Sequence, residues 1–339
     1  MNSLLLSRAV IKDRIVLETV GNAVVFLLKT RPAEALCRMQ LLAKGRDWAS
    51  FEYEGPLGPL AQLRLYSACS VPLGLLSPEG APSMEELDAR LTQSLSAGLL
   101  SLLSDQRGEI RFRVGPLRFG RWEIRDHLVH SYKWVNDPSD WQVNIQAVGP
   151  YLAAQLGFLH HGRRFARLLR SPASTNPVVA GLMSHLARPA RDSIVCDAFC
   201  GTGTLLVEID ALNRETFCFG IDHDSRQIAL ARQNLAGSFS KSLVNADARA
   251  LPLKPRSIDV FVSNLPFGKR SGTHAQNRAL YPAFAAELSR TMKPGGKAVL
   301  LTEEKRLFRQ AFTRPLKIIE EHMIETGGLH PSIFLVRRR

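Results

Sequence analysis

The chain has 339 residues, which is enough for two domains of ordinary size. Hydrophobic residues make up 45% of it and charged residues 22%, a balance typical of folded globular proteins that argues against disorder throughout the chain. The formal net charge of +13 points to a polyanionic partner, most often nucleic acid, although an arginine-rich solvated surface would give the same total.

The positive charge is concentrated in the second half of the chain. Residues 1–165 contain 19 Lys or Arg and 16 Asp or Glu, whereas residues 166–339 contain 25 and 15. Charges directly follow the first apolar run, residues 4–6, so we expect neither a signal peptide nor a membrane span. The five cysteines lack paired metal-ligand spacing, which predicts a reduced, cytoplasmic protein without a bound metal.

The first half has the pattern of an α+β module. Short apolar runs punctuated by Gly and Pro predict strands and turns over residues 14–75, with a helix near 32–43. Ser83 and Glu86 form a capping-box pattern, so an amphipathic helix is expected over 83–105. Alternation with period two predicts strands at 109–114 and 141–146, on either side of a helix at 122–134.

From about residue 190 the pattern changes to strand–loop–helix units. Strands are expected at 193–196, 217–221, 258–262 and 298–301, and helices at 177–186, 205–212, 225–235 and 281–292. Such alternation predicts a doubly wound, Rossmann-like α/β domain over residues 166–339, after an α+β module over 1–165. Ligands of such a sheet bind at the carboxyl ends of its strands.

The loop after the first of these strands, DAFCGTGT, runs from Asp197 to Thr204. Gly201 and Gly203 let the backbone approach a ligand, and the next helix begins with free N–H groups that can bind a carboxylate. Asp197 can accept a hydrogen bond from an ammonium group, directly or through water. Both groups occur in the methionine moiety of S-adenosylmethionine, which is therefore the expected cofactor.

Two more acidic residues follow the next strands. Asp222 lies 19 residues after Gly203, about where a carboxylate meets ribose hydroxyls in dinucleotide folds. Asp247 can accept from an adenine amino group, with Ala248 supplying a backbone N–H. The residues expected to bind the cofactor are Asp197, Phe199, Gly201, Thr202, Gly203, Thr204, Asp222, His223, Asp247, Ala248 and Asn264.

A nicotinamide dinucleotide and a purely structural glycine turn are the alternatives for this loop. Leu206 stands where the dinucleotide motif has its third glycine. Asp197, just ahead of the loop, would repel a pyrophosphate, whereas S-adenosylmethionine carries no phosphate. These two features favour S-adenosylmethionine.

The element Asn264–Leu265–Pro266–Phe267 follows the expected strand 258–262. The amino group of a nucleobase is a poor nucleophile because its lone pair is delocalised into the ring. The Asn264 side-chain oxygen and the Leu265 carbonyl could accept its two hydrogens, Pro266 would fix the backbone and Phe267 would stack on the ring. A plain turn with Phe267 in the core is the alternative, but the position downstream of the glycine loop favours catalysis at these four residues.

Residues from about 165 onward resemble the RNA guanine-N2 methyltransferases that carry an N-terminal THUMP domain. The resemblance rests on Ser171–Leu186, DAFCGTGTLLVE, NLPFGKR, NRALYPAF and MKPGGKAVLLTEEKRL, and Leu265 in place of Pro is typical of the tRNA-directed branch. It implies a class I methyltransferase fold, S-adenosylmethionine as cofactor, cofactor binding at the aspartates and glycines above, and amine binding at Asn264 and Phe267.

The first half resembles a divergent THUMP module with a ferredoxin-like lead-in. The clues are IRFRV, IRDHLVH, VNDPSDWQVNIQ and FLHHGRRFARL. The resemblance implies tRNA or another structured RNA as the partner. Lys269, Arg270 and Arg278 follow the amine-binding element and are expected to contact phosphates, with a solvated loop as the alternative.

The amine chemistry leaves other substrates open. A DNA or rRNA amino-methyltransferase would use the same residues, and so would a protein glutamine methyltransferase, which binds a side-chain amide. An RNA-binding module that keeps cofactor affinity without turnover is a further alternative, which the intact Asn264 and Phe267 argue against. We expect a tRNA guanine-N2 methyltransferase; the sequence does not indicate its oligomeric state.

Overall fold

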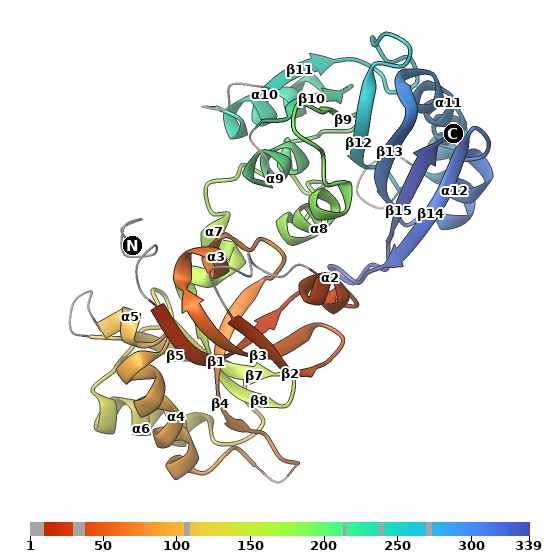
Figure 1. Ribbon diagram of the computed structural model, residues 1–339. Helices are drawn as coiled ribbons and strands as arrows, with labels where there is room; N and C mark the ends of the chain where they lie inside the picture. Colours follow the sequence, from red (N-terminus) through yellow and green to blue (C-terminus); the bar gives the residue numbers. More distant parts are fainter. Residues whose placement is uncertain are drawn as a thin grey trace. The chain divides into compact units, whose positions relative to one another are not determined.

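The computed structural model describes residues 10–29, 38–78, 80–104, 109–212, 215–236, 241–268 and 273–339 (Figure 1). The chain divides into two compact units, Met1–Ala166 and Arg167–Arg339, and each is described by itself. Within the described residues, no helix is both long and apolar enough to cross a membrane.

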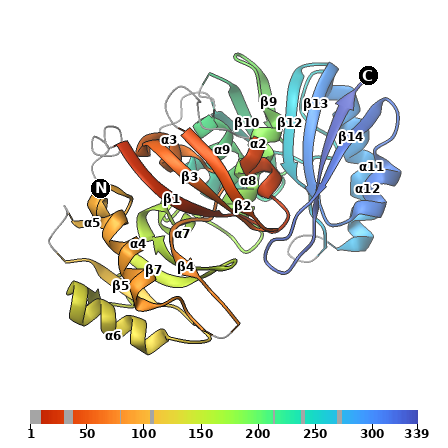
Figure 2. The same cartoon turned by 60° about the horizontal axis from the view of Figure 1, so that its bottom comes forward.

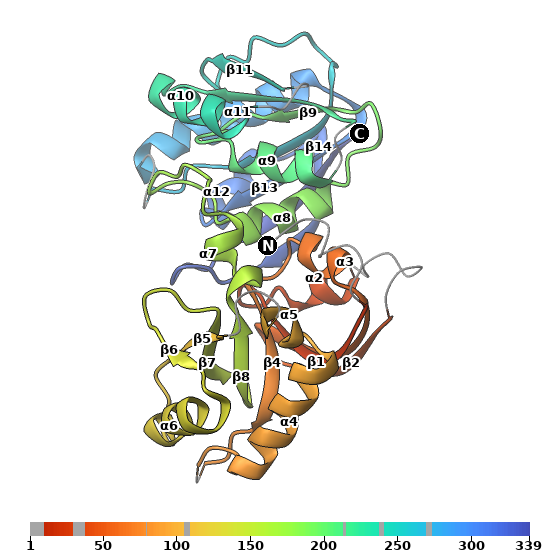
Figure 3. The ribbon, with the colours of Figure 1, turned by 90° about the vertical axis from the view of Figure 1, so that its left-hand side faces the viewer.

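The amino-terminal unit is built on an eight-stranded sheet with the order β2-β3-β1-β4-β8-β7-β5-β6. Its strands are β1 (Val10–Glu18), β2 (Arg38–Lys44), β3 (Trp48–Pro56), β4 (Ala68–Leu75), β5 (Arg111–Val114), β6 (Val135–Asn136), β7 (Val143–Val148) and β8 (Tyr151–Leu156). Its helices are α2 (Val24–Lys29), α3 (Leu57–Gln62), α4 (Met84–Ala97), α5 (Ser101–Ser104), α6 (Arg121–Tyr132) and α7 (His161–Arg164), with a short 3-10 turn at Gly157–Leu159. The longest of them, α4, packs against β1 and β4, and α6 packs against β5 (Figure 3).

The capping box that opens α4 is confirmed. The Ser83 hydroxyl accepts from the Glu86 N–H, and the Glu86 carboxylate accepts from the Ser83 N–H. The helix ends at Ala97 rather than near residue 105, because the backbone of Gly98 is extended; only glycine fits there, since a Cβ would clash with the buried Asp13 carboxylate. That carboxylate accepts from the Leu99 N–H and so turns the chain into the separate helix α5.

The prediction of a helix near residues 32–43 is wrong for residues 38–43, the part of it that the structure describes. Residues 38–44 form the edge strand β2, which pairs antiparallel with β3. Pairing with a neighbouring strand outweighs the helix propensity of the Met-Gln-Leu-Leu-Ala run. The remainder of that expected helix, through residue 37, lies outside the described residues.

The carboxy-terminal unit confirms the doubly wound α/β prediction. Its seven-stranded sheet has the order β11-β10-β9-β12-β13-β15-β14; β9 to β13 are parallel, and β15 runs antiparallel to both neighbours. The strands are β9 (Ile194–Asp197), β10 (Phe217–Asp222), β11 (Lys241–Asn245), β12 (Ile258–Asn264), β13 (Met292–Thr302), β14 (Leu316–Met323) and β15 (Ser332–Arg338). The helices are α8 (Pro177–Ala187), α9 (Thr204–Leu212), α10 (Ser225–Asn234), α11 (His274–Thr291) and α12 (Lys305–Ala311).

Helices cover both faces of this sheet (Figures 1 and 2). Alternate strand residues such as Cys196 and Phe261 join one buried cluster with Phe284 of α11 and Phe308 of α12. On the opposite face, Gly220 of β10 lies against Leu206 of α9, where a Cβ would be only 2.7 Å from the leucine side chain. The two covered faces leave the strand ends as the place where a ligand can reach the sheet.

Candidate active site

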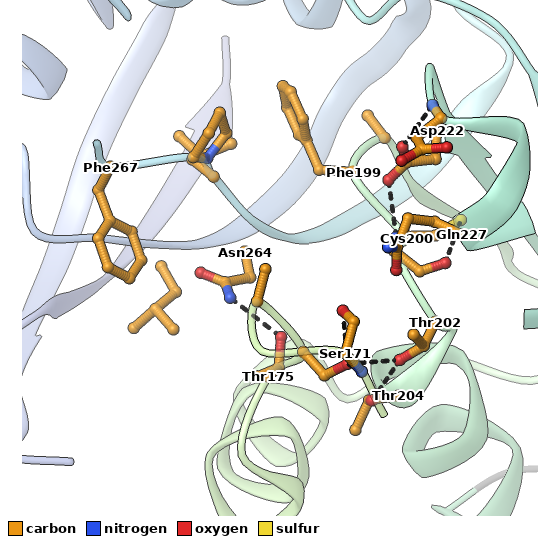
Figure 4. A pocket seen from close by; sticks show the side chains of 18 of the residues that line it. Ser171, Thr175, Phe199, Cys200, Thr202, Thr204, Asp222, Gln227, Asn264 and Phe267 are labelled. Atoms are coloured by element: carbon orange, nitrogen blue, oxygen red, sulfur yellow. Dashed lines mark hydrogen bonds between the residues drawn. The ribbon is translucent and has the colours of Figure 1, made fainter. Parts of the chain in front are cut away.

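The loops that follow β9, β10 and β12 line one cavity of about 730 Å³ at the carboxyl edge of the sheet (Figure 4). Segments 170–176, 276–280 and 326–331 complete its wall. Most residues predicted from the sequence to bind cofactor or amine border this cavity: Phe199, Gly201, Thr202, Thr204, Asp222, His223, Asp247, Ala248, Asn264, Leu265, Pro266 and Phe267.

Three predicted residues do not reach the wall of the cavity. Asp197 is fully buried and Gly203 packs against Ala231, while Arg278 borders a different cavity on the side of α11 and α12. Lys269 and Arg270 lie outside the described residues. The structure therefore brings together the cofactor and amine elements, while Arg278 lies apart from them and the phosphate contacts of Lys269 and Arg270 stay a prediction.

Asp197 braces the glycine loop from below. One of its oxygens accepts from the Phe199 N–H, and its other oxygen has no hydrogen-bond partner among the described residues. Burial raises the pKa of this carboxyl to about 7. The buried side chain does not border the cavity, and its predicted acceptance from a ligand ammonium, directly or through water, stays a prediction.

The glycine loop adopts a shape that side chains disfavour. Gly201 and Gly203 have φ of 50° and 80°, in the left-handed region. A Cβ on Gly201 would meet nothing within 4 Å, so its backbone borders open space. The Gly201 N–H donates to Asp222 Oδ2 at 2.8 Å, which ties this loop to the end of β10.

Asp222 is nearly buried, with 12% of its side chain exposed. It also accepts from the Asp224 N–H, through Oδ1 at 2.9 Å. A carboxylate has about four acceptor positions, so these two backbone bonds leave room for the hydroxyls of a diol. The adjacent His223 is largely exposed, with Nδ1 3.5 Å from Asp222 Oδ1.

Asp247 is already engaged by a neighbour that sequence reasoning missed. The Arg249 guanidinium donates to both carboxylate oxygens, at distances of 2.6 to 3.1 Å. This hydrogen bonding holds the pKa of Asp247 below its usual range. The carboxylate stays charged at the cavity wall, but a ligand amino group would share it with the arginine.

Asn264 ends β12 with its side-chain amide held in one orientation. Its Nδ2 donates to Thr175 Oγ1 at 3.1 Å, and its buried Oδ1 has no partner among the described residues. Figure 4 shows the oxygen turned away from Thr175. The cavity is thereby left with an acceptor that is ready for a donor such as an amine.

A chain of hydroxyl hydrogen bonds fixes the loop after Asn264. Tyr281 Oη donates to the Pro266 carbonyl at 2.8 Å and pairs with Thr302 Oγ1 at 2.7 Å. Thr302 in turn accepts from the Glu304 N–H. Burial raises the pKa of the Tyr281 phenol, so this group remains protonated and keeps its role as donor.

The segment before α8 supplies wall residues that the sequence analysis did not assign. Ser174 Oγ lies 2.9 Å from Thr202 Oγ1, which connects the segment to the glycine loop, and Thr175 holds Asn264. The signal available in the sequence was the run Ser171–Asn176 directly before the Pro177 helix start. Its hydroxyl-rich composition, however, fits an ordinary helix entry equally well.

Comparison with known proteins agrees with this geometry. Residues 164–331 match the family described as the RMKL-like methyltransferase domain. The carboxy-terminal unit belongs to this family.

Relatives and solved structures extend the likeness. The chain is 31% identical over 190 residues to the tRNA (guanine(6)-N(2))-methyltransferase THUMP3 of Mus musculus, covering 49% of this chain and 37% of that protein. It is 29% identical over 163 residues to the U6 snRNA (guanine-N(2))-methyltransferase THUMPD2 of Bos taurus, covering 46% and 32%. Both alignments thus span only about a third of the relative. The crystal structure of TrmN from Thermus thermophilus shares the fold along the chain, with a TM-score of 0.74 at 23% identity, covering 96% of this chain and 99% of that one.

Proposed function

We propose that the chain is an S-adenosylmethionine-dependent methyltransferase that modifies the exocyclic N2 amine of guanosine in RNA, with tRNA as the substrate and the cytoplasm as the compartment. One observation carries the proposal: Asn264, whose Oδ1 has no partner among the described residues, borders the same cavity as Gly201 and Asp222. An acceptor for an amine thus lies beside a wall suited to a nucleoside-like methyl donor. The names of the two curated relatives support guanosine N2 as the amine.

The residues of the cavity fit S-adenosylmethionine. The volume of about 730 Å³ lies within the range of small-molecule sites, roughly 300 to 1,000 Å³. The Gly201 backbone borders open space and can approach the methionine moiety, while Asp222 can accept from the ribose hydroxyls. When bound, the cofactor supplies an electrophilic methyl group.

The chain's own contribution to the reaction is to orient the amine. Asn264 Oδ1 and the Leu265 carbonyl would accept its two hydrogens, which favours a tetrahedral, more nucleophilic nitrogen. Phe267 would stack on the ring, and the Tyr281 hydrogen bond to Pro266 keeps the loop in place. No base is required before attack, because the proton can leave to solvent afterwards.

The contact between Thr175 and Asn264 leads to a graded prediction. Thr175→Val removes the acceptor for Asn264 Nδ2 with little change in shape, so the amide can invert and present its NH₂ group to the substrate amine. Loss of one hydrogen bond, about 1 kcal/mol, predicts a fall in kcat of about fivefold to tenfold with little change in KM. Thr175→Ser keeps the hydroxyl and should retain activity. Equal kcat values for the Val and Ser variants would contradict this positioning role.

The amino-terminal unit carries a hollow suited to RNA. A cavity of about 500 Å³ is bordered by Arg113, Arg121, Trp122 and Arg125. Trp122 is 57% exposed, and the guanidinium carbons of Arg121 and Arg125 lie 5.1 and 4.6 Å from its ring centroid. Arginines beside an exposed aromatic ring can pair with phosphates while the ring stacks on a base.

This hollow reconciles the low net charge of the first half with an RNA partner. Three of the unit's arginines, Arg113, Arg121 and Arg125, border the same hollow as Trp122. We therefore include a THUMP-like RNA-binding role for the amino-terminal unit, residues 1–165, in the proposal. The phosphate-contact role of Lys269, Arg270 and Arg278 also remains part of it.

The hollow can be tested apart from catalysis. The combined change Arg121→Glu and Trp122→Ala is expected to raise the Kd for an unmodified tRNA transcript about tenfold or more, because a phosphate contact and a stacking contact are lost. Fluorescence anisotropy at one fixed salt concentration measures this, and cofactor affinity should not change. Lys12→Glu makes the same charge reversal on the exposed side of β1 and serves as the control. Equal weakening by the control would exclude a specific role for the hollow.

The function itself is tested by nucleoside mass spectrometry of RNA fractions from a deletion strain. Loss of N2-methylguanosine from tRNA, restored by the wild-type gene, is the expected result. Loss confined to small nuclear or ribosomal RNA would keep the chemistry and change the RNA. An unchanged RNA profile together with loss of a methylated glutamine or a methylated DNA base would refute the proposal.

A further inference from the structure

Asn277 is a polar side chain in the wall of the same cavity. It lies in the first turn of α11 and is fully buried. Neither Nδ2 nor Oδ1 has a hydrogen-bond partner among the described residues. Buried amides in folded proteins are nearly always paired, so an amide left unpaired at a cavity wall indicates a ligand that completes it.

The fold places Asn277 beside the amine-binding loop. Tyr281, one helical turn later, lies on the same face of α11 and donates to the Pro266 carbonyl. At the start of the helix, Gly268 approaches so closely that a Cβ on it would lie 3.2 Å from the His274 nitrogen. The face of α11 that carries Asn277 therefore packs along residues 266–268, next to the acceptor of Asn264.

We propose that Asn277 reads the Watson–Crick edge of the target guanine, an inference that rests on the proposed function. With the N2 amine held at Asn264, the neighbouring positions on that edge are N1–H, a donor, and O6, an acceptor. The Asn277 amide offers the complementary pair, with Oδ1 accepting from N1–H and Nδ2 donating to O6. Enzymes that act on an extruded base commonly recognise it through this edge.

The pairing separates the roles of the two asparagines. In Asn264 only the acceptor Oδ1 lacks a partner among the described residues, because Nδ2 donates to Thr175. Asn277 keeps both a donor and an acceptor, as recognition of N1–H and O6 together requires. Asn264 thus orients the reacting nitrogen, and Asn277 recognises the ring that carries it as guanine.

The test combines an enzyme change with a matched substrate change. The RNA in which the wild-type enzyme forms N2-methylguanosine is prepared with either guanosine or 2-aminopurine riboside at the methylated position. The analogue keeps the 2-amine but lacks N1–H and O6. The wild-type enzyme is expected to lose about 10- to 100-fold in kcat/KM on the analogue, as for one or two lost hydrogen bonds. On the guanosine substrate, Asn277→Ala should lose a similar factor in kcat/KM. Replacing guanosine by the analogue should lower the kcat/KM of Asn277→Ala by at most a further factor of about two.

If Asn277→Ala only disturbed packing, it would lower kcat/KM by the same factor on both substrates. The losses from the enzyme change and from the substrate change would then multiply, and that result would overturn the proposal. Weakened S-adenosylhomocysteine binding by Asn277→Ala in calorimetry would also overturn it, because that would assign the amide to the cofactor. Gln233→Ala truncates an exposed amide on α10 and should match the wild type on both substrates. If the wild-type enzyme forms no N2-methylguanosine in any RNA, the proposed function fails before this comparison is reached.

Discussion

Asn264→Ala is expected to abolish methyl transfer while leaving cofactor binding nearly intact. The change removes the Asn264 Oδ1 acceptor, which has no partner among the described residues and makes no contact to the glycine loop or Asp222 there. Loss of a preorganised acceptor aimed at the reacting group typically costs on the order of 10²- to 10³-fold in kcat. The fall should therefore appear in single-turnover rates, with the cofactor Kd changed by less than about threefold.

The turnover of Asn264→Ala can be compared with that of Asn264→Asp, a variant that keeps the acceptor oxygen. Asn264→Asp retains an oxygen for the amine but cannot donate to Thr175, so an intermediate rate is expected. Calorimetric titration with S-adenosylhomocysteine measures cofactor affinity independently of turnover. A parallel loss of turnover and cofactor affinity in Asn264→Ala would show that the side chain mainly supports the cofactor wall, contrary to the assigned role.

The sequence located the site through motifs that are local in the chain. Gly201 requires its left-handed φ within a short loop, and the Asn-Leu-Pro-Phe element directly follows a strand, so both could be recognised without knowledge of the rest of the fold. The alternation of strands and helices then placed both at the carboxyl edge of one sheet. The cofactor and amine elements were therefore predictable together.

Features that depend on pairing between distant segments were not predictable in this way. Thr175 lies 89 residues from Asn264 in the chain, and no local pattern announces that it orients the amide. Asn277 reads as an ordinary helix residue until its burial and lack of partners are known. The burial of Asp197 and its hydrogen bond from the Phe199 N–H likewise depend on tertiary packing, which the position of a carboxylate at a strand end does not reveal.

Dependence on contacts between distant segments also explains the wrong predictions in the first half of the chain. Residues 38–44 have helix-forming composition, yet their backbone groups pair with β3. The arginines around Trp122 are spread from residue 113 to residue 125 and gather only when β5 and α6 fold beside one hollow. Net charge summed over a domain cannot reveal such a cluster, because it carries no information on position.

Asp222→Ala is expected to weaken cofactor binding by about 10- to 100-fold. The change removes the acceptor proposed for the ribose hydroxyls and releases the Gly201 N–H that ties the glycine loop to β10. Hydrogen bonds to a charged group contribute about 1.5 to 3 kcal/mol each, so loss of even one accounts for this range. S-adenosylmethionine and S-adenosylhomocysteine should be affected equally, because they share the ribose.

The ribose contact can be separated from loosening of the loop with a cofactor analogue. A 2′-deoxy analogue of S-adenosylhomocysteine should bind the wild-type protein more weakly than the parent compound, whereas Asp222→Ala should bind the two almost alike. Asp224→Ala alters a neighbouring carboxylate that caps α10 and pairs with Arg226. This variant should bind the 2′-deoxy analogue more weakly than the parent compound by the same factor as the wild type does. If Asp222→Ala still bound the analogue more weakly than the parent compound by the full wild-type factor, the ribose would be held elsewhere in the cavity. Asp222 would then act only by tying the glycine loop to β10.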